Sequence, residues 1–466
     1  MKLGLVGPSY QERSIPYDAQ RTINLYPVMD QQGGKEVAAL YGTPGLDLFS
    51  TVGLGSIRGL WFSVENTRAF AVSGTDFYEI DSSGNGTVLG SINTTGSACT
   101  FADNGNQLAV CDGTSLYILT FATNTFAQVS DVDFPGAGSV CFLDGYFIVN
   151  DPSTGQFYIS ALFDGTSWDA LDFATAEGLP DNIVRVFATN QALLLMGENS
   201  TELWVNSGGG DFPFTRSGGR IDTGCAAAHS VVALDNTVFF VGRNDRGWGV
   251  VYRMSGATPE RVSTHFIEEK IQALADVTVL RAWAYQESGH DFYVLTGGLL
   301  ETTLVYDCAT GLWHERAFLD DGAFKKHLAA TSMFAFGKTI VGDRLSGKIY
   351  QMSENFYDDD GDEIKRTRVF THLSNEGERV IANSLQIDFE RGVGLTTGQG
   401  SDPKAWIRVS RDFGRNYGNE MYASINAIGV TRPRAMWRRL GQFECLTIEL
   451  NVSDPVKVAI CGAYLK

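Results

Sequence analysis

The stretch LWFSVENTRAFAVSGTDFYEI, residues 60–80, contains the pattern that decides the fold. Three short apolar runs, Leu60–Phe62, Ala69–Val72 and Phe77–Ile80, are separated by turns that contain Glu-Asn and Ser-Gly. Short apolar runs bounded by turn residues are typical of antiparallel strands, because each turn reverses the direction of the chain. This stretch therefore predicts one small β-sheet.

The same design repeats from Ile57 to about Asp358. The repeated units lie at residues 60–80, 103–119, 140–159, 184–205, 231–254, 282–307 and 332–352. A period of roughly 40 to 50 residues with about four strands is typical of β-propeller blades, since each small sheet is stable only against its neighbours. We expect an all-β protein with six or seven blades. A β-sandwich built from the same strands is the alternative, because turns and alternation do not determine how sheets pack.

Three regions follow from this pattern. Residues 1–56 lack it and contain four prolines, so we expect an extended N-terminal arm with little sheet of its own. Residues 57–358 are the predicted propeller, and apolar residues at helical spacing within 266–274 predict a short helix inserted between two blades. Residues 359–466 contain strand-like runs without the blade spacing, which predicts a separate, sandwich-like β domain.

The charge balance argues against tight nucleic-acid binding. The formal net charge is −18, from 54 Asp and Glu against 36 Lys and Arg. Proteins that wrap DNA gain their affinity from Lys and Arg that neutralise phosphates. An acidic wall repels phosphate and lets DNA pass without sticking, and an acidic surface also serves solubility.

The seven cysteines do not form a C-x-x-C pair, and their odd number disfavours a full disulfide framework. We therefore expect folding in a reducing cytosol. The stretch before Pro8 is too short for the apolar region of a signal peptide, and no uninterrupted apolar run is long enough to cross a bilayer. We expect no membrane insertion.

The acidic stretch Asp358–Glu363 admits two interpretations. Clustered carboxylates are ligands for Ca²⁺, but the stretch lacks the alternate spacing, the sixth-position Gly and the twelfth-position Glu of an EF-hand. A solvated interdomain linker is the favoured interpretation. Asp358, Asp359 and Asp360 are candidate partner-facing or DNA-facing residues.

Ser410, Asp412, Gly414 and Tyr417 match the S-x-D-x-G-x-x-aromatic pattern of an Asp-box hairpin. This hairpin occurs in sialidases and in many non-enzymatic β proteins. The expected role is structural, because Asp accepts backbone N–H groups, Gly takes an unusual backbone conformation and the aromatic ring covers the turn.

Catalysis is not expected. A sialidase needs an arginine cluster with a Tyr nucleophile and a Glu, and no such Tyr and Glu can be assigned to the arginines of residues 432–439. Trp437, Arg438 and Arg439 are instead candidates for contact with an acidic partner or with DNA phosphate, or are ordinary strand residues. The six histidines are dispersed without metal-binding spacing, so we expect no metal and no cofactor.

Several separated strings resemble the packaged-DNA stabilisation, or tail accessory factor, family of short-tailed bacteriophages. These strings, in the order of the family, are Gln20–Pro27, Gly42–Leu46, Ser263–Thr264 with Ile267–Glu268, Val305–Asp307 with Trp313, Asn416–Gly418 and Trp437–Gly441. They span nearly the whole chain.

The resemblance implies a non-enzymatic virion protein of the phage tail that is assembled in the cytoplasm of the host bacterium. It implies a homo-hexameric hub or nozzle ring below the portal and adaptor proteins, which closes the DNA exit channel after packaging. It also implies that the ring carries tailspikes or fibres and a tail needle, while DNA passes without tight binding. The alternative is a glycan-binding or glycan-cleaving propeller, which requires an arginine-lined, aromatic-walled pocket at the propeller centre.

Overall fold

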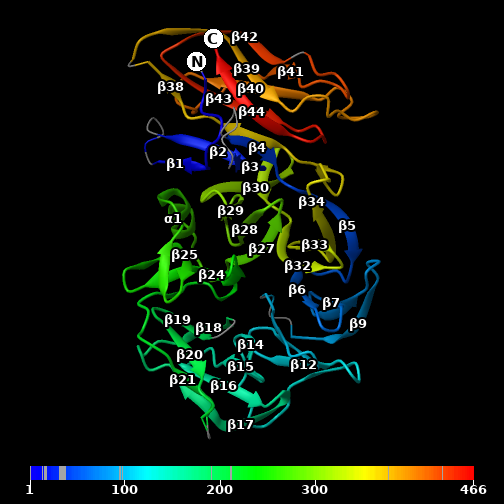
Figure 1. Cartoon of the computed structure of the whole chain (residues 1–466), viewed down its shortest axis with the longest axis vertical. Coiled ribbons are helices and arrows are strands. Elements are labelled where there is room, and N and C mark those ends of the chain that lie inside the picture. Colours follow the sequence, from blue (N-terminus) through cyan, green and yellow to red (C-terminus); the bar gives the residue numbers. More distant parts are fainter. Residues whose placement is uncertain are drawn as a thin grey trace.

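The computed structural model describes residues 2–466 except 13, 15–17, 31–37, 94, 95, 97, 190, 191, 210, 211, 376 and 433. The molecule is elongated, with a β-propeller at one end and a β-sandwich at the other (Figure 1). Nearly all of the described regular structure is strand. The exceptions are the helix α1 (His265–Gln272) and the short 3₁₀ helix η1 (Ala228–Ser230).

The first four blades are four-stranded antiparallel sheets whose strands follow one another in sequence. Blade one contains β6 (Ile57–Ser63), β7 (Arg68–Ser73), β8 (Asp76–Ile80) and β9 (Gly86–Ser91). Blade two contains β10 (Thr100–Asp103), β11 (Gln107–Cys111), β12 (Leu116–Thr120) and β13 (Thr125–Gln128). Blade three contains β14 (Val140–Leu143), β15 (Tyr146–Asn150), β16 (Gln156–Ala161) and β17 (Asp164–Thr175). Blade four contains β18 (Ile183–Ala188), β19 (Leu193–Gly197), β20 (Thr201–Asn206) and β21 (Phe214–Arg216).

Three further blades complete the ring. Blade five contains β22 (Gly224–Cys225), β23 (Val232–Leu234), β24 (Thr237–Asn244), β25 (Gly247–Ser255) and β26 (Thr258–Arg261). Blade six contains β27 (Arg281–Glu287), β28 (His290–Thr296), β29 (Thr303–Asp307) and β30 (Leu312–Asp320), with β31 (Ala323–Lys326) paired to β30. Blade seven contains β32 (Ala329–Ala335), β33 (Lys338–Asp343), β34 (Lys348–Ser353) and, as its fourth strand, β5 (Gly45–Thr51).

The pairing of β5 with β34 closes the propeller. Blade seven therefore joins strands from the two ends of the propeller sequence, and the chain passes directly from β5 into β6 of blade one. Leu46 of β5 is completely buried in the cluster between blades six and seven. This closure locks the ring, because blades one and seven cannot separate unless β5 leaves its sheet.

The propeller core is divided among seven hydrophobic clusters, each between two neighbouring blades. Between blades one and seven, for example, Leu60 packs with Met333 and Ile340. Between blades five and six, Ile267 and Ile271 of α1 join the cluster. Each blade is thus stabilised by apolar area that it buries against both neighbours.

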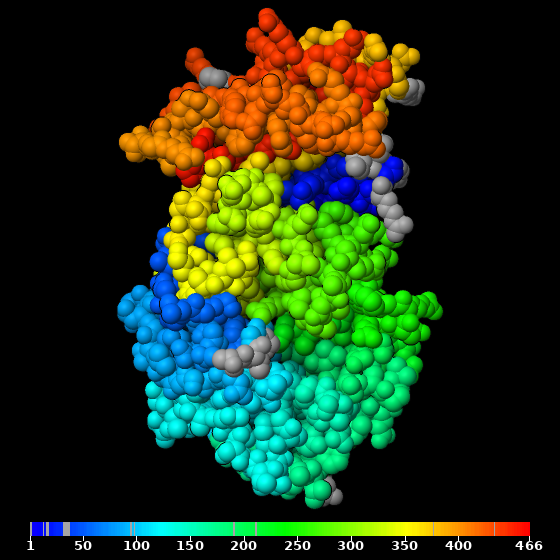
Figure 2. Space-filling view, turned by 180° about the vertical axis from the view of Figure 1, so that it is seen from behind, coloured from blue at the N-terminus to red at the C-terminus, as the bar shows by residue number. Residues whose placement is uncertain are grey.

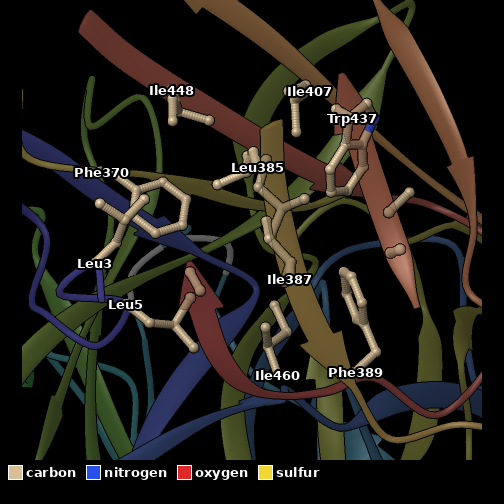
Figure 3. Close-up of a cluster of buried hydrophobic side chains, with 14 of the residues drawn as sticks. Leu3, Leu5, Phe370, Leu385, Ile387, Phe389, Ile407, Trp437, Ile448 and Ile460 are labelled. Atoms are coloured by element: carbon tan, nitrogen blue, oxygen red, sulfur yellow. The ribbon is translucent and has the colours of Figure 1, made fainter. Parts of the chain in front are cut away.

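The sandwich consists of two sheets with a shared core. One sheet contains β3 (Leu25–Met29), β4 (Ala38–Gly42), β44 (Ala459–Leu465), β39 (Val380–Phe389) and β42 (Ala435–Phe443). The other contains β2 (Ala19–Ile23), β37 (Arg366–Val369), β43 (Cys445–Val452), β40 (Lys404–Ser410) and β41 (Met421–Ser424). In the core between them, Leu385 and Trp437 of the first sheet lie in one cluster with Ile407 and Ile448 of the second (Figure 3).

The second sheet does not end at the sandwich. Strand β2 pairs with β37 on one side and, through Ile23 and Glu315, with β30 of blade six on the other. The result is one twelve-stranded sheet that runs from the propeller into the sandwich. Figure 2 shows the blue N-terminal segment between the orange sandwich and the green blades.

Four short strands complete the architecture. These are β1 (Tyr10–Gln11), which pairs with β2, β35 (Asp358–Asp359) and β36 (Asp362–Glu363), which form a hairpin at the edge of blade seven, and β38 (Leu373–Ser374), which pairs with β43.

The predicted propeller and β-sandwich are confirmed, and each of the seven repeated units lies in its own blade. The predicted helix is α1, between blades five and six. The expected extended arm differs from the structure, because its described residues supply β1 to β5 to three sheets. Those sheets pair the N-terminal strands with strands hundreds of residues away, and such long-range partners leave no trace in local sequence.

Candidate functional site

Buried charged side chains gather where the propeller, the N-terminal strands and the sandwich meet, a region we call the junction. Glu315 of β30 is completely buried. Arg21 donates Nε and Nη2 hydrogen bonds to its carboxylate at 3.0 and 2.7 Å, and Lys270 Nζ lies 3.3 Å from Oε2. Burial would raise the pKa of Glu315, but Arg21 and Lys270 outweigh it, and the pKa lies far below its usual range. Ionised Glu315 therefore ties β2 and α1 to blade six.

Arg368 of β37 binds the N-terminal segment from the opposite side of β2. Arg368 is 1% exposed, and its guanidinium donates hydrogen bonds to Leu5 O at 2.8 Å, Gln20 Oε1 at 2.8 Å and Thr22 Oγ1 at 2.9 Å. Burial lowers the pKa of Arg368 to about 10, with Asp18 acting in the opposite direction. At neutral pH Arg368 remains charged and holds the N-terminal segment through charge-assisted hydrogen bonds.

Asn24 joins the propeller to the start of the sandwich directly. It lies between β2 and β3 with a φ of +55°, a conformation that Asn adopts more readily than most residues. Its Nδ2 donates to Ala317 O of blade six at 2.8 Å and to Lys365 O at 2.9 Å, and its Oδ1 accepts from Ala317 N at 2.8 Å. One buried amide therefore satisfies backbone groups of both domains.

The acidic stretch forms the hairpin of β35 and β36 at this junction, where Asp362 and Glu363 are exposed but Asp359 is not. Asp359 is 2% exposed, and its Cα pairs with that of Leu46 in blade seven. The Asp360 carboxylate lies 2.6 Å from Lys348 Nζ, and Asp358 is half-buried. The expectation that all three aspartates face a partner is corrected for Asp359, because its pairing with β5 buries it.

Burial raises the pKa of Asp359 to about 7, although Arg316 and Arg366 act to lower it. Arg316 is itself buried and donates to Pro44 O at 2.7 Å. Arg366 donates to Tyr357 O at 3.2 Å, and burial lowers its pKa to about 10. This part of the junction therefore contains a buried carboxyl group whose pKa of about 7 reflects burial, opposed by two buried cations.

The candidates on β42 separate into buried and exposed residues. Trp437 is 3% exposed and donates its indole N–H to Met421 O at 2.7 Å. The expectation of a partner-facing Trp437 is therefore wrong for this side chain, because the strand alternation points it into the sandwich core. Arg438 and Arg439 are exposed. They remain available to an acidic partner or to phosphate.

The Asp-box-like residues form a compact turn after β40. Asp412 accepts hydrogen bonds from Asn416 N at 2.9 Å and from Ser410 Oγ at 2.6 Å. Gly414 has a φ of +87°, and Tyr417 lies against it. The Ser410 hydroxyl also accepts a bond from Gly414 N at 2.9 Å. All of these contacts lie within the turn, so their role here is to hold its shape.

The propeller has a cavity of about 1170 Å³ at the end of the inner strands of blades four to seven. Its lining includes aromatic rings (Phe187, Tyr285, Phe334), amides (Asn236, Gln286) and one carboxylate (Asp235), and all lining residues are described. None of them is an arginine. The arginine clamp that a sialic-acid carboxylate requires is therefore not at this cavity.

Metal and membrane features are also not found in the described parts of the chain. No group of three or more His, Cys, Asp or Glu side chains there could hold a metal ion. His290 Nδ1 lies 2.9 Å from Asp307 Oδ2. Burial lowers the pKa of His314 to about 3. No described helix is long and apolar enough to cross a membrane.

Sequence reasoning missed the charged residues of the junction, namely Glu315, Arg316, Arg366 and Arg368. The signal was present in β30, where three ionisable residues in a row, 314–316, interrupt a strand whose other residues are mostly apolar. The string Gln20–Pro27, which carries part of the family resemblance, supplies partners for two of these charges, Glu315 and Arg368.

Three of the solved structures that resemble the chain illustrate how low the sequence identity is. The N-terminal domain of Nup159 is 10% identical, with 72% of this chain and 98% of that chain covered and a TM-score of 0.40. The Cps50 (Swd1) β-propeller domain of Myceliophteria thermophila is 8% identical, with 66% and 99% covered and a TM-score of 0.42. The extracellular domain of BT4673 from B. thetaiotaomicron is 10% identical, with 87% and 59% covered and a TM-score of 0.44. At these TM-scores the three structures add nothing to the assignment.

No curated protein sequence matches the chain. Two family descriptions do match it. Residues 1–357 match the family described as Bacteriophage P22 Gp10, beta-propeller, and residues 365–466 match Bacteriophage P22 Gp10, beta-sandwich. Together the two matches cover nearly the whole chain in the order of its two domains. The chain belongs to the Bacteriophage P22 Gp10 family of packaged-DNA stabilisation proteins, or tail accessory factors, which are structural proteins of the phage virion.

Proposed function

We propose that this chain is the subunit of a homo-hexameric hub or nozzle ring in the phage tail. The ring closes the DNA exit channel after packaging, stabilises the packaged DNA and carries tailspikes or fibres and a needle. It binds the portal and adaptor proteins, and its role is mechanical without a catalytic step. Assembly takes place in the host cytoplasm. Membership of the family supports a structural role in the phage tail, and the ring, its partners and its assembly are the finer parts of the proposal.

The twelve-stranded sheet that crosses the junction is the observation that carries the proposal. Domains connected only by a linker move relative to each other by default. Here β2 pairs with strands of both domains, and Glu315, Arg368 and Asn24 hold it there. A subunit built in this way transmits force between its two ends without a hinge. That property suits a ring that resists the pressure of packaged DNA.

The charge distribution supports the same role. With a net charge of −18, the surface repels DNA, so a channel formed by several copies would let DNA slide. The exposed pair Arg438 and Arg439 on β42 offers a local cationic patch for an acidic partner. We expect that patch to contact another tail protein.

The test is the mass of the purified chain in solution, alone and after mixing with the portal and adaptor complex. The proposal expects six copies on the complex, even if the free chain is monomeric. The double variant Arg438→Glu, Arg439→Glu should bind less well than the charge-matched control Arg243→Glu, Arg246→Glu, which changes two exposed propeller arginines. A chain that ignores the complex and binds or cleaves a glycan would contradict the proposal and favour an adhesin.

A further inference from the structure

The cavity of the propeller is a candidate ligand site that the structural role of the subunit does not use. It has a volume of about 1170 Å³ and lies where β18, β23, β27 and β32, the inner strands of blades four to seven, end. Pockets for drug-sized ligands have roughly 300–1,000 Å³. The cavity therefore has room for a ligand built from several units.

Phe334 of β32 contributes an exposed aromatic ring to the wall of this cavity. The residue is 69% exposed, and Phe187 adds a second, half-buried ring to the lining. No described ring stacks on Phe334, whereas Phe336, two residues later, packs against Phe62 with ring centroids 5.5 Å apart. A ligand that covers the Phe334 ring would remove apolar area from water, which favours binding.

Most polar groups of the lining are uncharged and open to a ligand. Asn236 is exposed, and its side-chain amide forms no hydrogen bond with a described residue. Gln286 Nε2 donates to Asp291 Oδ1, so Gln286 Oε1 is available as an acceptor. Thr339 adds a hydroxyl group. Amides and hydroxyls both donate and accept hydrogen bonds, and sugar hydroxyls do the same.

The charge of the lining disfavours acidic ligands. Among the described lining residues Asp235 is the one carboxylate, and none is Lys, Arg or His. A phosphate or a sugar acid would therefore meet a repelling charge and no attracting one. One carboxylate is also too few for glycoside cleavage, which uses a pair of Asp or Glu residues. This lining suits binding of an uncharged ligand without cleavage.

A tight turn holds Asp235 and Asn236 at the cavity. The two residues join β23 to β24, and their φ values are +50° and +53°. Two successive residues with positive φ are typical of a type I′ hairpin turn, in which Asp and Asn are favoured. The turn accounts for the residue types, and it orients both side chains without using their polar atoms. A ligand would find these groups already in place, which reduces the cost of ordering them.

We propose that this cavity binds an uncharged oligosaccharide, with Phe334 as a stacking surface and Asp235, Asn236 and Gln286 as hydrogen-bond partners. A sugar ring has the required combination of surfaces. Its C–H groups can cover an aromatic ring, while the hydroxyls at its edge bond to amides and a carboxylate. The volume of the cavity accepts more than one sugar unit. This binding does not depend on the hexameric ring proposed above.

Calorimetric titration of the full chain with uncharged hexasaccharides tests the class of ligand. The probes are maltohexaose, cellohexaose, chitohexaose and mannohexaose, and the acidic control is hexagalacturonate. The expected result is saturable binding of at least one uncharged probe, with one molecule bound per chain, and no binding of the acidic control. Failure of all four uncharged probes, or tighter binding of hexagalacturonate, would overturn the proposal.

Three variants test the position of the site. Phe334→Ala should weaken binding by about tenfold, because the stacking surface is lost. Asn236→Gly should weaken it by about three- to tenfold, because glycine keeps the positive φ of the turn but removes the amide. The matched control is Phe163→Ala, since Phe163 is 54% exposed and lines a separate cavity of about 380 Å³. It should bind as the wild type does.

Binding retained in both Phe334→Ala and Asn236→Gly, or lost in Phe163→Ala, would also overturn the proposal. If Phe334→Ala does not fold, Asn236→Gly alone decides. Binding of a sugar and binding to the portal and adaptor complex are separate measurements, so the failure of one proposal can be told from the failure of the other.

Discussion

Replacing Arg368 with Met should release the N-terminal segment from the junction. The guanidinium of Arg368 donates three hydrogen bonds of 2.8 to 2.9 Å to Leu5, Gln20 and Thr22. A hydrogen bond with a charged partner contributes about 1.5–3 kcal/mol, and the burial of the charge offsets part of the total. Met fills most of the volume but leaves the acceptors unpaired. We expect a net local loss of about 3–4 kcal/mol.

Hydrogen exchange measures this loss where it occurs. The amides of Thr22, which donates to Ser9 Oγ, and Asn24, which donates to Glu315 O, report on β2. A loss of 3–4 kcal/mol corresponds to roughly 10²–10³-fold faster exchange at these amides, while exchange in blades one to four stays unchanged.

The matched control is Arg379→Met, since Arg379 is 69% exposed in an ion pair with Glu444. Unchanged protection of Thr22 and Asn24 in Arg368→Met would refute the role given to Arg368.

Three more predictions concern individual groups. Glu315→Gln should lower the urea midpoint at pH 7. Because the folded pKa of Glu315 lies below its ordinary 4.5, the ionised carboxylate stabilises the fold above pH 4.5, and this stabilisation is lost as pH falls through the folded pKa. The difference in urea midpoint between variant and wild type should therefore narrow on acidification. Asp359→Asn should raise the urea midpoint at pH 8 but not at pH 4. The folded pKa of Asp359 is about 7, against an ordinary 3.8, so the ionised carboxylate destabilises the folded protein. Equal urea midpoints of variant and wild type at pH 8 would contradict this. Gly414→Ala should destabilise the sandwich by about 1–2 kcal/mol in thermal unfolding, because its φ of +87° strains any side chain. A loss no larger than that of Gly418→Ala, a nearby glycine outside the positive-φ region, would argue against the geometry of the turn.

The propeller could be predicted because its information is local. Each blade is a run of hairpins, and the turn residues and apolar runs of residues 60–80 recur in all seven units. The closing strand Gly45–Thr51 could not be predicted in the same way. Its partner Lys348–Ser353 lies about 300 residues later, and nothing in either segment specifies that long-range pairing.

The candidate site was less accessible from sequence. Arg438 and Arg439 are exposed as a surface role requires, but their neighbour Trp437 points into the core. Strand alternation predicts that neighbours face opposite sides, yet it does not say which side is buried. Asp359 shows the same limit, because a charge run suggests exposure to solvent, whereas pairing with β5 buries this residue. Charges become structural when the three-dimensional fold provides partners from distant segments.

Retention of packaged DNA is the measurement that tests the central claim most directly. Heads packaged in the absence of this chain are incubated with nuclease and compared with heads to which the purified chain, or its Arg368→Met variant, has been added. A hub that closes the exit channel predicts loss of DNA without the chain, protection with the wild type and weaker protection with the variant. Equal retention of DNA with and without the chain would contradict the account.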